Sequence, residues 1–130
     1  MAGEPIEGQA LVLAAAKASV PSTRLPDLID VAQAELEARV ERYRREYEEL
    51  DVSADELGVQ DEVAASGFLV EGGHWETLGE ELGFDRRESD AVRRAHEEQL
   101  LRIGRRRDRA EEFDAALEIR EPVFVAEGGG

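Results

Sequence analysis

Residues 26–50 have the sequence PDLIDVAQAELEARVERYRREYEEL, and this stretch predicts a long amphipathic helix. Pro26 suits the first turn of a helix, where its missing N–H group leaves no hydrogen bond unmade. Apolar side chains recur at heptad spacing, with Gln33 as the polar exception. The stripe is too short for a free coiled coil, so we expect it to pack within a helical bundle or across a homodimer. Its members are Ile29, Leu36, Val40, Tyr43, Tyr47 and Leu50.

Further helices are expected on both sides of this stretch. Residues 6–20 are rich in Ala and Leu and predict a first helix that is largely buried. Ser53 with Glu56 three residues later has the pattern of a capping box and predicts a short helix. Residues 74–82 predict another short helix, which ends at Gly83 because glycine tolerates the left-handed conformation of a helix cap.

Two more helices are predicted toward the C-terminus. Asp85 and Glu88 form a second capping-box pattern, which begins a long helix that ends near Ile103. We expect His96 to be half-exposed in the middle of this helix. Gly104 is expected to interrupt the helical pattern, and residues 105–119 predict a further helix.

Two short segments favour β-strands. Residues 67–71 and residues 122–126 contain Phe, Val and Leu, and each segment is the natural partner of the other. We therefore expect a mainly α fold, a compact helical domain of about five helices with a minor two-stranded β element. Residues 1–126 are expected to form a single helical domain, and residues 127–130 a flexible C-terminal tail.

Charge is the most unusual property of the composition. The 130 residues include 31 Asp and Glu against 16 Lys and Arg, which gives a net charge of -15, and Lys17 is the only lysine. Dense carboxylates stay hydrated at molar salt, where the Debye length is about 3 Å and surface charges hardly repel one another. The composition resembles that of small acidic uncharacterised proteins of halophilic archaea. An acidic protein from a GC-rich genome, which also favours Arg over Lys, is the alternative.

Several functional classes find no support in the sequence. The chain has no cysteine, which excludes disulfides, thiolate catalysis and cysteine zinc sites. No apolar run approaches the length of a membrane span, and the N-terminus lacks the basic region of a signal peptide, so we expect a cytoplasmic protein. His74 and His96 lack the spacing of metal ligands, and no nucleotide-binding or hydrolase motif occurs. We therefore expect no enzymatic activity, no catalytic or metal-binding residue, no cofactor and no small-molecule substrate.

The segment of residues 75–94 resembles the helix-turn-helix motif. That motif has a small residue in its first helix, a glycine at the turn, an apolar residue after the turn and apolar residues that face inward. Gly79, Gly83 and Phe84 fit the first three positions, but Ser89 stands where an aliphatic residue is expected. The resemblance implies nucleic-acid binding, although two packed helices joined by a glycine turn match most of the same pattern. The inner positions are Leu78, Leu82 and Val92.

Of the segments 1–83, 84–110 and 111–130, only residues 84–110 have a net positive charge. Residues 84–110 hold 9 bases and 6 acids, whereas residues 1–83 hold 6 bases and 19 acids. A basic cluster can neutralise the phosphates of a nucleic acid. We favour, over nucleic-acid binding, the alternative that the arginines pair with carboxylates of the chain, such as Glu111 and Glu112. The candidate contact residues are Arg86, Arg87, Arg93, Arg94, Arg102, Arg105, Arg106, Arg107 and Arg109.

These observations lead to two functional hypotheses. The first is a non-enzymatic, salt-adapted regulatory or adaptor module that acts by protein–protein contact, with an unknown protein partner or as a homodimer through the apolar stripe. The alternative is a helix-turn-helix-like regulator that binds nucleic acid through the Arg-rich residues 84–110.

Overall fold

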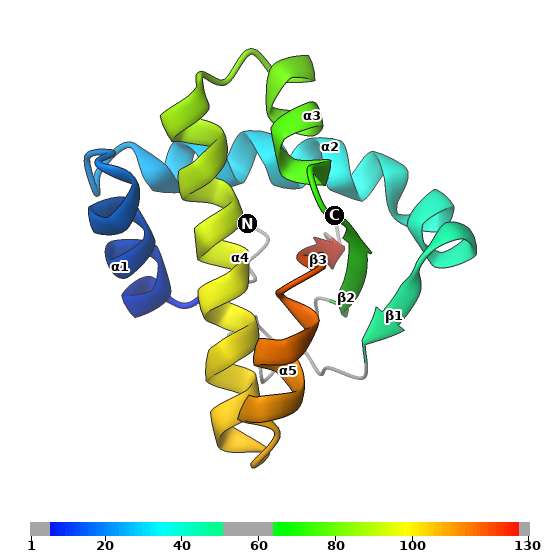
Figure 1. The fold of residues 1–130 in the computed structure, drawn as a ribbon. Coiled ribbons are helices and arrows are strands. Elements are labelled where there is room, and N and C mark those ends of the chain that lie inside the picture. The colour runs from blue at the N-terminus through cyan, green and yellow to red at the C-terminus, as the bar shows by residue number, and fades with distance from the viewer. Residues whose placement is uncertain (1–5, 51–63, 128–130) are drawn as a thin grey trace.

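The computed structural model describes residues 6–50 and 64–127 of the chain (Figure 1). Within these ranges there are five helices and three strands, which confirms the predicted mainly α class. The helix predicted from Ser53 and the tail residues 128–130 lie outside the described residues, and Glu127 belongs to a strand rather than to a tail. The order is α1 (Gly8–Ala18), α2 (Leu25–Glu46), β1 (Glu48–Leu50), β2 (Ala64–Glu71), α3 (His74–Glu81), α4 (Arg86–Arg106), α5 (Ala110–Ala116) and β3 (Arg120–Glu127).

The three strands form one antiparallel sheet in the order β1-β2-β3. The predicted pairing of the segments around Phe68 and Phe124 is confirmed, because Phe68 lies opposite Val123 and Gly67 lies opposite Phe124. These central residues alternate between the two faces of the sheet, and Phe68, Val123 and Phe124 are all buried.

Strand β1 extends the sheet beyond the two strands that the sequence predicts. Helix α2 ends at Glu46 rather than near Leu50, and Tyr47 adopts an extended conformation with φ -127° and ψ 158°. Residues 48–50 then pair with residues 67–69 of β2. Pairing with a strand distant in sequence thus outweighs the local helical preference of this Glu-rich end.

Helix α4 runs through the middle of the fold, and α1, α3 and α5 pack along it (Figure 1). Its predicted capping box is confirmed: the backbone N–H of Glu88 donates to Oδ1 of Asp85 over 2.8 Å, and that of Asp85 donates to Oε1 of Glu88 over 2.9 Å. Gly104 does not interrupt α4, which continues to Arg106. The missing side chain instead lets α5 approach closely, because a Cβ at Gly104 would lie 2.9 Å from Cδ2 of Phe113.

Helices α3 and α4 are joined by a tight turn, as predicted. Gly83 has a φ of 80°, and the N–H of Phe84 donates to the carbonyl of Gly79 over 2.8 Å. Gly79 faces Ser89 across the two helices, and a Cβ at Gly79 would lie 2.9 Å from Cβ of Ser89. The small Ser89, where an aliphatic residue is expected, is therefore what this close approach requires.

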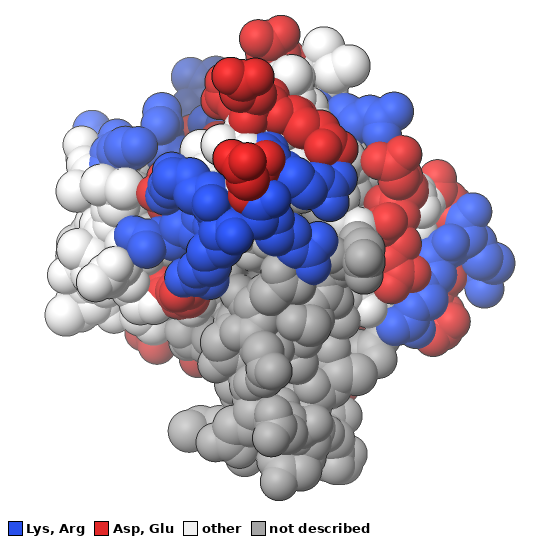
Figure 2. All heavy atoms as spheres, turned by 90° about the horizontal axis from the view of Figure 1, so that it is seen from below, with Lys and Arg blue, Asp and Glu red and all other residues white. Residues whose placement is uncertain are grey.

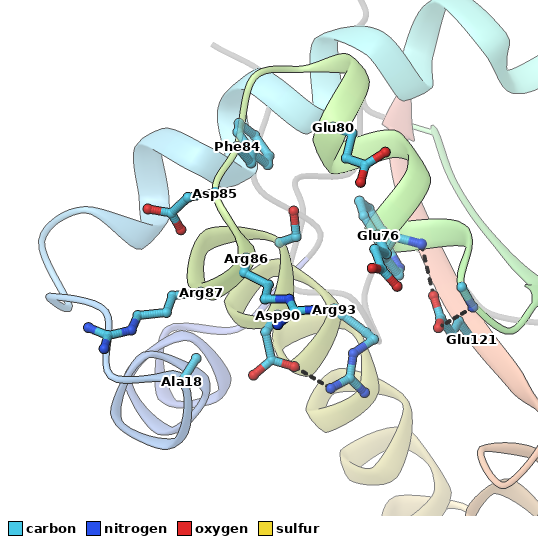
Figure 3. Close-up of a pocket in the computed structure, with 13 residues that line it drawn as sticks. Ala18, Glu76, Glu80, Phe84, Asp85, Arg86, Arg87, Asp90, Arg93 and Glu121 are labelled. Atoms are coloured by element: carbon cyan, nitrogen blue, oxygen red, sulfur yellow. Dashed lines mark hydrogen bonds and ion pairs between the residues drawn. The ribbon is translucent and has the colours of Figure 1, made fainter.

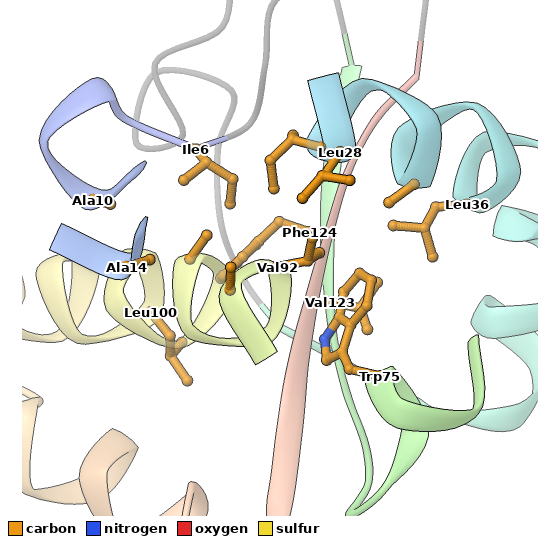
Figure 4. Packing of buried hydrophobic residues seen from close by; sticks show 14 of the residues in the cluster. Ile6, Ala10, Ala14, Leu28, Leu36, Trp75, Val92, Leu100, Val123 and Phe124 are labelled. Carbon is orange, nitrogen blue, oxygen red and sulfur yellow. The ribbon is translucent and has the colours of Figure 1, made fainter. Parts of the chain in front are cut away.

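The core lies between α1, α2, α4 and the sheet, and Trp75 closes it from α3 (Figure 4). Its largest fully buried side chains include Trp75, Tyr43, Phe68 and Phe124. His96 is also 0% exposed, which corrects the expectation of a half-exposed position. Strand β3 and helix α3 cover this side of α4, a long-range arrangement that the local pattern does not reveal.

Candidate functional site

The nine candidate arginines do not form one surface. Arg86 begins α4 and Arg106 ends it. A helix rises 1.5 Å per residue, so about 30 Å separate the two ends of α4. A basic segment that is continuous in sequence is therefore divided into two distant groups, with Arg93 and Arg94 between them.

Arginines gather at the C-terminal end of α4, with carboxylates beside them (Figure 2). Nη2 of Arg109 lies 2.6 Å from Oε1 of Glu112, one of the two partners that the sequence suggests. The guanidinium of Arg109 also stacks over the ring of Phe113, with 4.6 Å between Cζ and the ring centroid. Arg107 is the half-buried C-cap residue of α4. Ion pairing within the chain, the favoured alternative, is thus what the structure shows for Arg109.

Three more arginines of this end are paired in the same way. Arg106 pairs with Glu7, which precedes α1. A hydrogen bond from Arg106 lowers the pKa of the Glu7 carboxyl, against the opposing effect of its burial. Arg102 and Arg105 both approach Oε1 of Glu98, at 3.9 Å and 3.5 Å. Two guanidinium groups therefore share a single carboxylate.

The middle arginines of α4 are also engaged. Arg93 pairs with Asp90 on one side and with Glu97 on the other, where Nη1 lies 2.8 Å from Oε2. Nε of Arg94 lies 2.7 Å from Oδ2 of Asp90. Burial raises the pKa of Asp90, but the hydrogen bonds from Arg94 and Arg93 outweigh it and lower the pKa overall. This group stabilises one side of α4 rather than presenting free cations.

Arg86 and Arg87, in the first turn of α4, are different. Both are exposed and make no hydrogen bond or ion pair with a described residue. They line a groove of about 790 Å³ between α3, the start of α4 and the end of α1, where Ala18 contributes to the wall (Figure 3). These two residues are the arginines of the predicted set that remain available for a ligand.

Carboxylates dominate the rest of this groove. Glu76 and Glu80 of α3 line it together with the aromatic side chains of Phe84 and Trp75. Glu121 also lines it and accepts hydrogen bonds from the backbone N–H groups of Gly73 (2.8 Å) and Trp75 (2.9 Å), which caps the start of α3. Acidic groups close to Arg86 and Arg87 disfavour phosphate, so the groove matches poorly the basic surface that nucleic-acid binding requires.

The apolar stripe of α2 lies inside the domain. Ile29, Leu36, Val40 and Tyr43 are buried in the core of this single chain. The two remaining members, Tyr47 and Leu50, are partly buried and pack against the same core, with Leu50 in β1 rather than in the helix. The described part of this stripe thus packs within the domain of a single chain.

Helix α1 differs from the largely buried helix that its sequence predicts. Ala10, Leu11, Ala14 and Ala15 pack inward, chiefly against α4. The opposite side, which we call the α1 face, is exposed, with Val12 60% and Leu13 38% accessible. None of its residues is a carboxylate, and only Lys17 is charged. Figure 2 shows uncharged, white atoms beside the arginines on the left, the side on which α1 lies in Figure 1. The α1 face consists of Gly8, Gln9, Val12, Leu13, Ala16 and Lys17.

His96 is fully buried, and His74 is mostly buried. Nδ1 of His96 accepts a hydrogen bond from the backbone N–H of Phe124 over 3.0 Å, and its Nε2 has no hydrogen-bond partner. Burial lowers the pKa of His96 to about 3, so the imidazole is neutral near pH 7. His74 lies 2.8 Å from the hydroxyl of Tyr43 through Nε2. Across residues 6–50 and 64–127, no three His, Asp or Glu side chains gather as a metal site would require.

Sequence reasoning missed Val12 and Leu13 as surface residues. Periodicity identifies α1 as apolar on every side, but it does not tell which side receives a partner. A usable signal was present, because residues 8–18 contain no acidic residue in a chain with 31 of them. A surface free of carboxylates is the exception in such a protein.

None of the helices in residues 6–50 and 64–127 is both long enough and apolar enough to span a membrane.

Residues 4–127 match the family model described as "Domain of unknown function (DUF8048)". The match covers nearly the whole chain, which therefore belongs to this family. No curated protein and no solved structure matches the chain significantly.

Proposed function

We propose that this member of the DUF8048 family is a non-enzymatic module that acts by protein–protein contact, and that the α1 face is its contact surface. The observation that carries the proposal is the exposure of Val12 and Leu13 on a face without carboxylates, in a chain with a net charge of -15. Exposed apolar patches that differ from the surrounding surface mark interaction sites. The proposal places the protein in a salt-rich cytoplasm, as its composition suggests.

The α1 face is preformed. Leu11, Ala14 and Ala15 fix the inner side of α1 against α4, so a partner meets a helix that is already folded and docked. Preorganisation lowers the entropic cost of association. Removing a Val or Leu side chain from water contributes about 1.5–3 kcal/mol when burial is complete. A partner polypeptide that covers Val12 and Leu13 with its own apolar side chains gains this stabilisation.

Nucleic-acid binding is the second candidate, because Arg86 and Arg87 have no ion pair with a described residue. The other candidate arginines support it less. Binding to phosphates through Arg102, Arg105 or Arg109 would first break their existing ion pairs with carboxylates. A gel shift at high salt with duplex DNA and with structured RNA tests this alternative. Retardation by the parent protein and its loss in the Arg86→Glu/Arg87→Glu variant would favour nucleic-acid binding over our proposal.

Site-specific photocrosslinking tests the proposed contact role. A photoreactive phenylalanine analogue replaces Val12 in one variant and the exposed Glu111 of α5 in a matched control. Both variants are irradiated in a high-salt extract of cells that naturally produce the protein. We expect a discrete crosslinked polypeptide from position 12 that is absent from position 111 and disappears when Leu13→Glu is added.

The outcomes separate the possible partners. Equal products from both positions, or a product that is indifferent to Leu13→Glu, would overturn the proposed surface. A nuclease-sensitive product would replace the proposed partner with nucleic acid. A product composed of two copies of this chain would keep the contact role but make the partner a second copy.

A further inference from the structure

The α1 face has cationic groups at both of its ends. Lys17 lies in the last turn of α1, at the C-terminal end of the face. At the other end, Nη1 of Arg102 donates to Oε1 of Gln9 over 3.2 Å, which brings the α4 cluster to the edge of the α1 face. Arg106 pairs with Glu7 immediately before the helix. The apolar centre at Val12 is therefore bordered by cations.

Arg102 and Arg105 have fewer carboxylate partners than guanidinium groups among the described residues. Glu98 is shared by Arg102 and Arg105, and it is the only ion-pair partner of either among the described residues. Nε of Arg102 is buried and has no hydrogen-bond partner, because its distance of 3.9 Å to Glu98 is too long for a hydrogen bond. The guanidinium of Arg105 remains more than half exposed. Among the described residues, this corner thus has two guanidinium groups that share one carboxylate.

The cation at the other end is Lys17. The structure gives Lys17 no ion pair with a described residue. Its ammonium group can accept a carboxylate from a partner without losing such a contact.

A second copy of the chain fits this charge pattern poorly. An antiparallel pairing of two α1 helices about a two-fold axis would bring Lys17 toward the Arg102 end of its partner. A parallel pairing would bring the two Lys17 side chains together. Either arrangement places like charges in contact around the apolar centre, which disfavours association.

We infer that the partner of the α1 face is an acidic amphipathic polypeptide segment, with apolar side chains at its centre and a carboxylate toward each end. This inference rests on the proposed contact role of the face. Gln9 and Lys17 are eight residues apart, which corresponds to about 12 Å along a helix. A helical partner of this kind has Asp or Glu residues about two turns apart, on either side of its apolar residues.

Three synthetic helical peptides test the inference. They share one stripe of leucines and differ only in the flanking residues, which are Glu, Gln or Lys. Binding to the labelled peptides is measured by fluorescence anisotropy at the lowest potassium chloride concentration that keeps the full helical circular dichroism signal, because charges interact over longer distances at lower salt. We expect the Glu peptide to bind at least about tenfold more tightly than the Lys peptide, a difference of about 1.4 kcal/mol. The Gln peptide should lie between the two.

Charge reversal locates the effect. Lys17→Glu combined with Arg105→Glu should remove most of the preference for the Glu peptide and leave binding of the Gln peptide nearly unchanged. Arg45→Glu is the matched control, because Arg45 is an exposed residue near the end of α2, far from α1 in the fold (Figure 1). Arg45→Glu should leave the preference for the Glu peptide intact if Lys17 and Arg105 cause that preference.

The results distinguish the inference from the proposal beneath it. In one outcome, the Gln peptide binds the parent protein but not the Val12→Glu variant, and the Glu peptide binds no more tightly than the Lys peptide. This outcome would retain the contact role and overturn the acidic partner. If none of the three peptides binds the parent protein more tightly than the Val12→Glu variant, this inference is overturned. The photocrosslinking outcome then decides the contact role separately.

Discussion

The backbone N–H of Phe124 in β3 donates to Nδ1 of His96 in α4 over 3.0 Å. This bond joins the sheet to the central helix and fixes the neutral tautomer of the imidazole, with its proton on Nε2. The imidazole ring is parallel to the ring of Phe124, with centroids 6.0 Å apart, and contacts the tilted ring of Trp75 at 4.5 Å. Protonation would remove the acceptor from this bond and place a charge in the core.

The burial of His96 predicts a specific loss of stability in mild acid. The folded pKa is about 3, whereas an unfolded histidine titrates near 6.5. The unfolded state therefore binds more protons between these values, and stability falls as the pH decreases through this window. From about pH 7.5 to pH 5 we expect the free energy of unfolding to fall by about 2 kcal/mol through this residue.

Denaturant unfolding of the parent and of His96→Gln at both pH values measures this effect. A glutamine oxygen can still accept from the N–H of Phe124, and the other titrating groups are common to both proteins. The parent should lose about 2 kcal/mol more than the variant on acidification. Equal losses in the two proteins would show that His96 is not the group responsible.

Gly79 permits the close contact of α3 with α4. Gly79→Ala would place Cβ 2.9 Å from Cβ of Ser89 and closer still to its hydroxyl oxygen. We expect a destabilisation of about 1–3 kcal/mol from this overpacking, measured by thermal or denaturant unfolding. Gly8→Ala is the matched control, because a Cβ there meets nothing within 4 Å. A stabilised Gly79→Ala protein would contradict the described helix contact.

The α2 stripe should behave as the core of one chain. Leu36 is fully buried, so Leu36→Ala should cost about 2–5 kcal/mol. The exposed neighbour Glu37 provides a control, since Glu37→Ala should change stability by less than about 0.5 kcal/mol. Association through the stripe would make the melting temperature depend on protein concentration. Since the stripe packs within one chain, we expect no such dependence. A melting temperature that rises with concentration and loses this dependence in Leu36→Ala would instead assign the stripe to a dimer.

The charge of -15 predicts that folding depends on salt. Repulsion among surface carboxylates acts over about 10 Å at 0.1 M salt but over only about 3 Å at 1 M. We expect far-ultraviolet circular dichroism to show loss of helix when potassium chloride is dialysed away, and recovery when it is restored. A helical signal that is indifferent to salt would count against a salt-adapted protein.

Features set by neighbours in sequence were predictable. The Asp85–Glu88 capping box and the turn at Gly83 depend on a few adjacent residues, and both are confirmed. The pairing of the segments around Phe68 and Phe124 was also predictable, because both segments favour strands and each can pair with the other. The mainly α class followed from the helical periodicity of the longer segments.

Features set by distant contacts were not predictable. β1 forms because β2 offers an edge to residues 48–50, which a helical pattern in α2 does not reveal. His96 is buried because β3 returns beside α4 late in the chain. The division of the arginines between ion pairs and free groups depends on which carboxylates the fold brings near them, as with Arg106 and Glu7. The exposure of the α1 face has the same origin, because only the docked position of α1 decides which of its apolar sides stays open.

The central claim, that the α1 face is the contact surface, is tested most directly by one comparison of photocrosslinking yields. The crosslinker occupies position 12, and the adjacent Leu13 is either retained or changed in Leu13→Glu. A carboxylate placed in the apolar centre must be desolvated on contact, so we expect the yield of crosslinked partner to fall at least about tenfold. An undiminished yield, from a Leu13→Glu protein with the same circular dichroism as the parent, would contradict the claim.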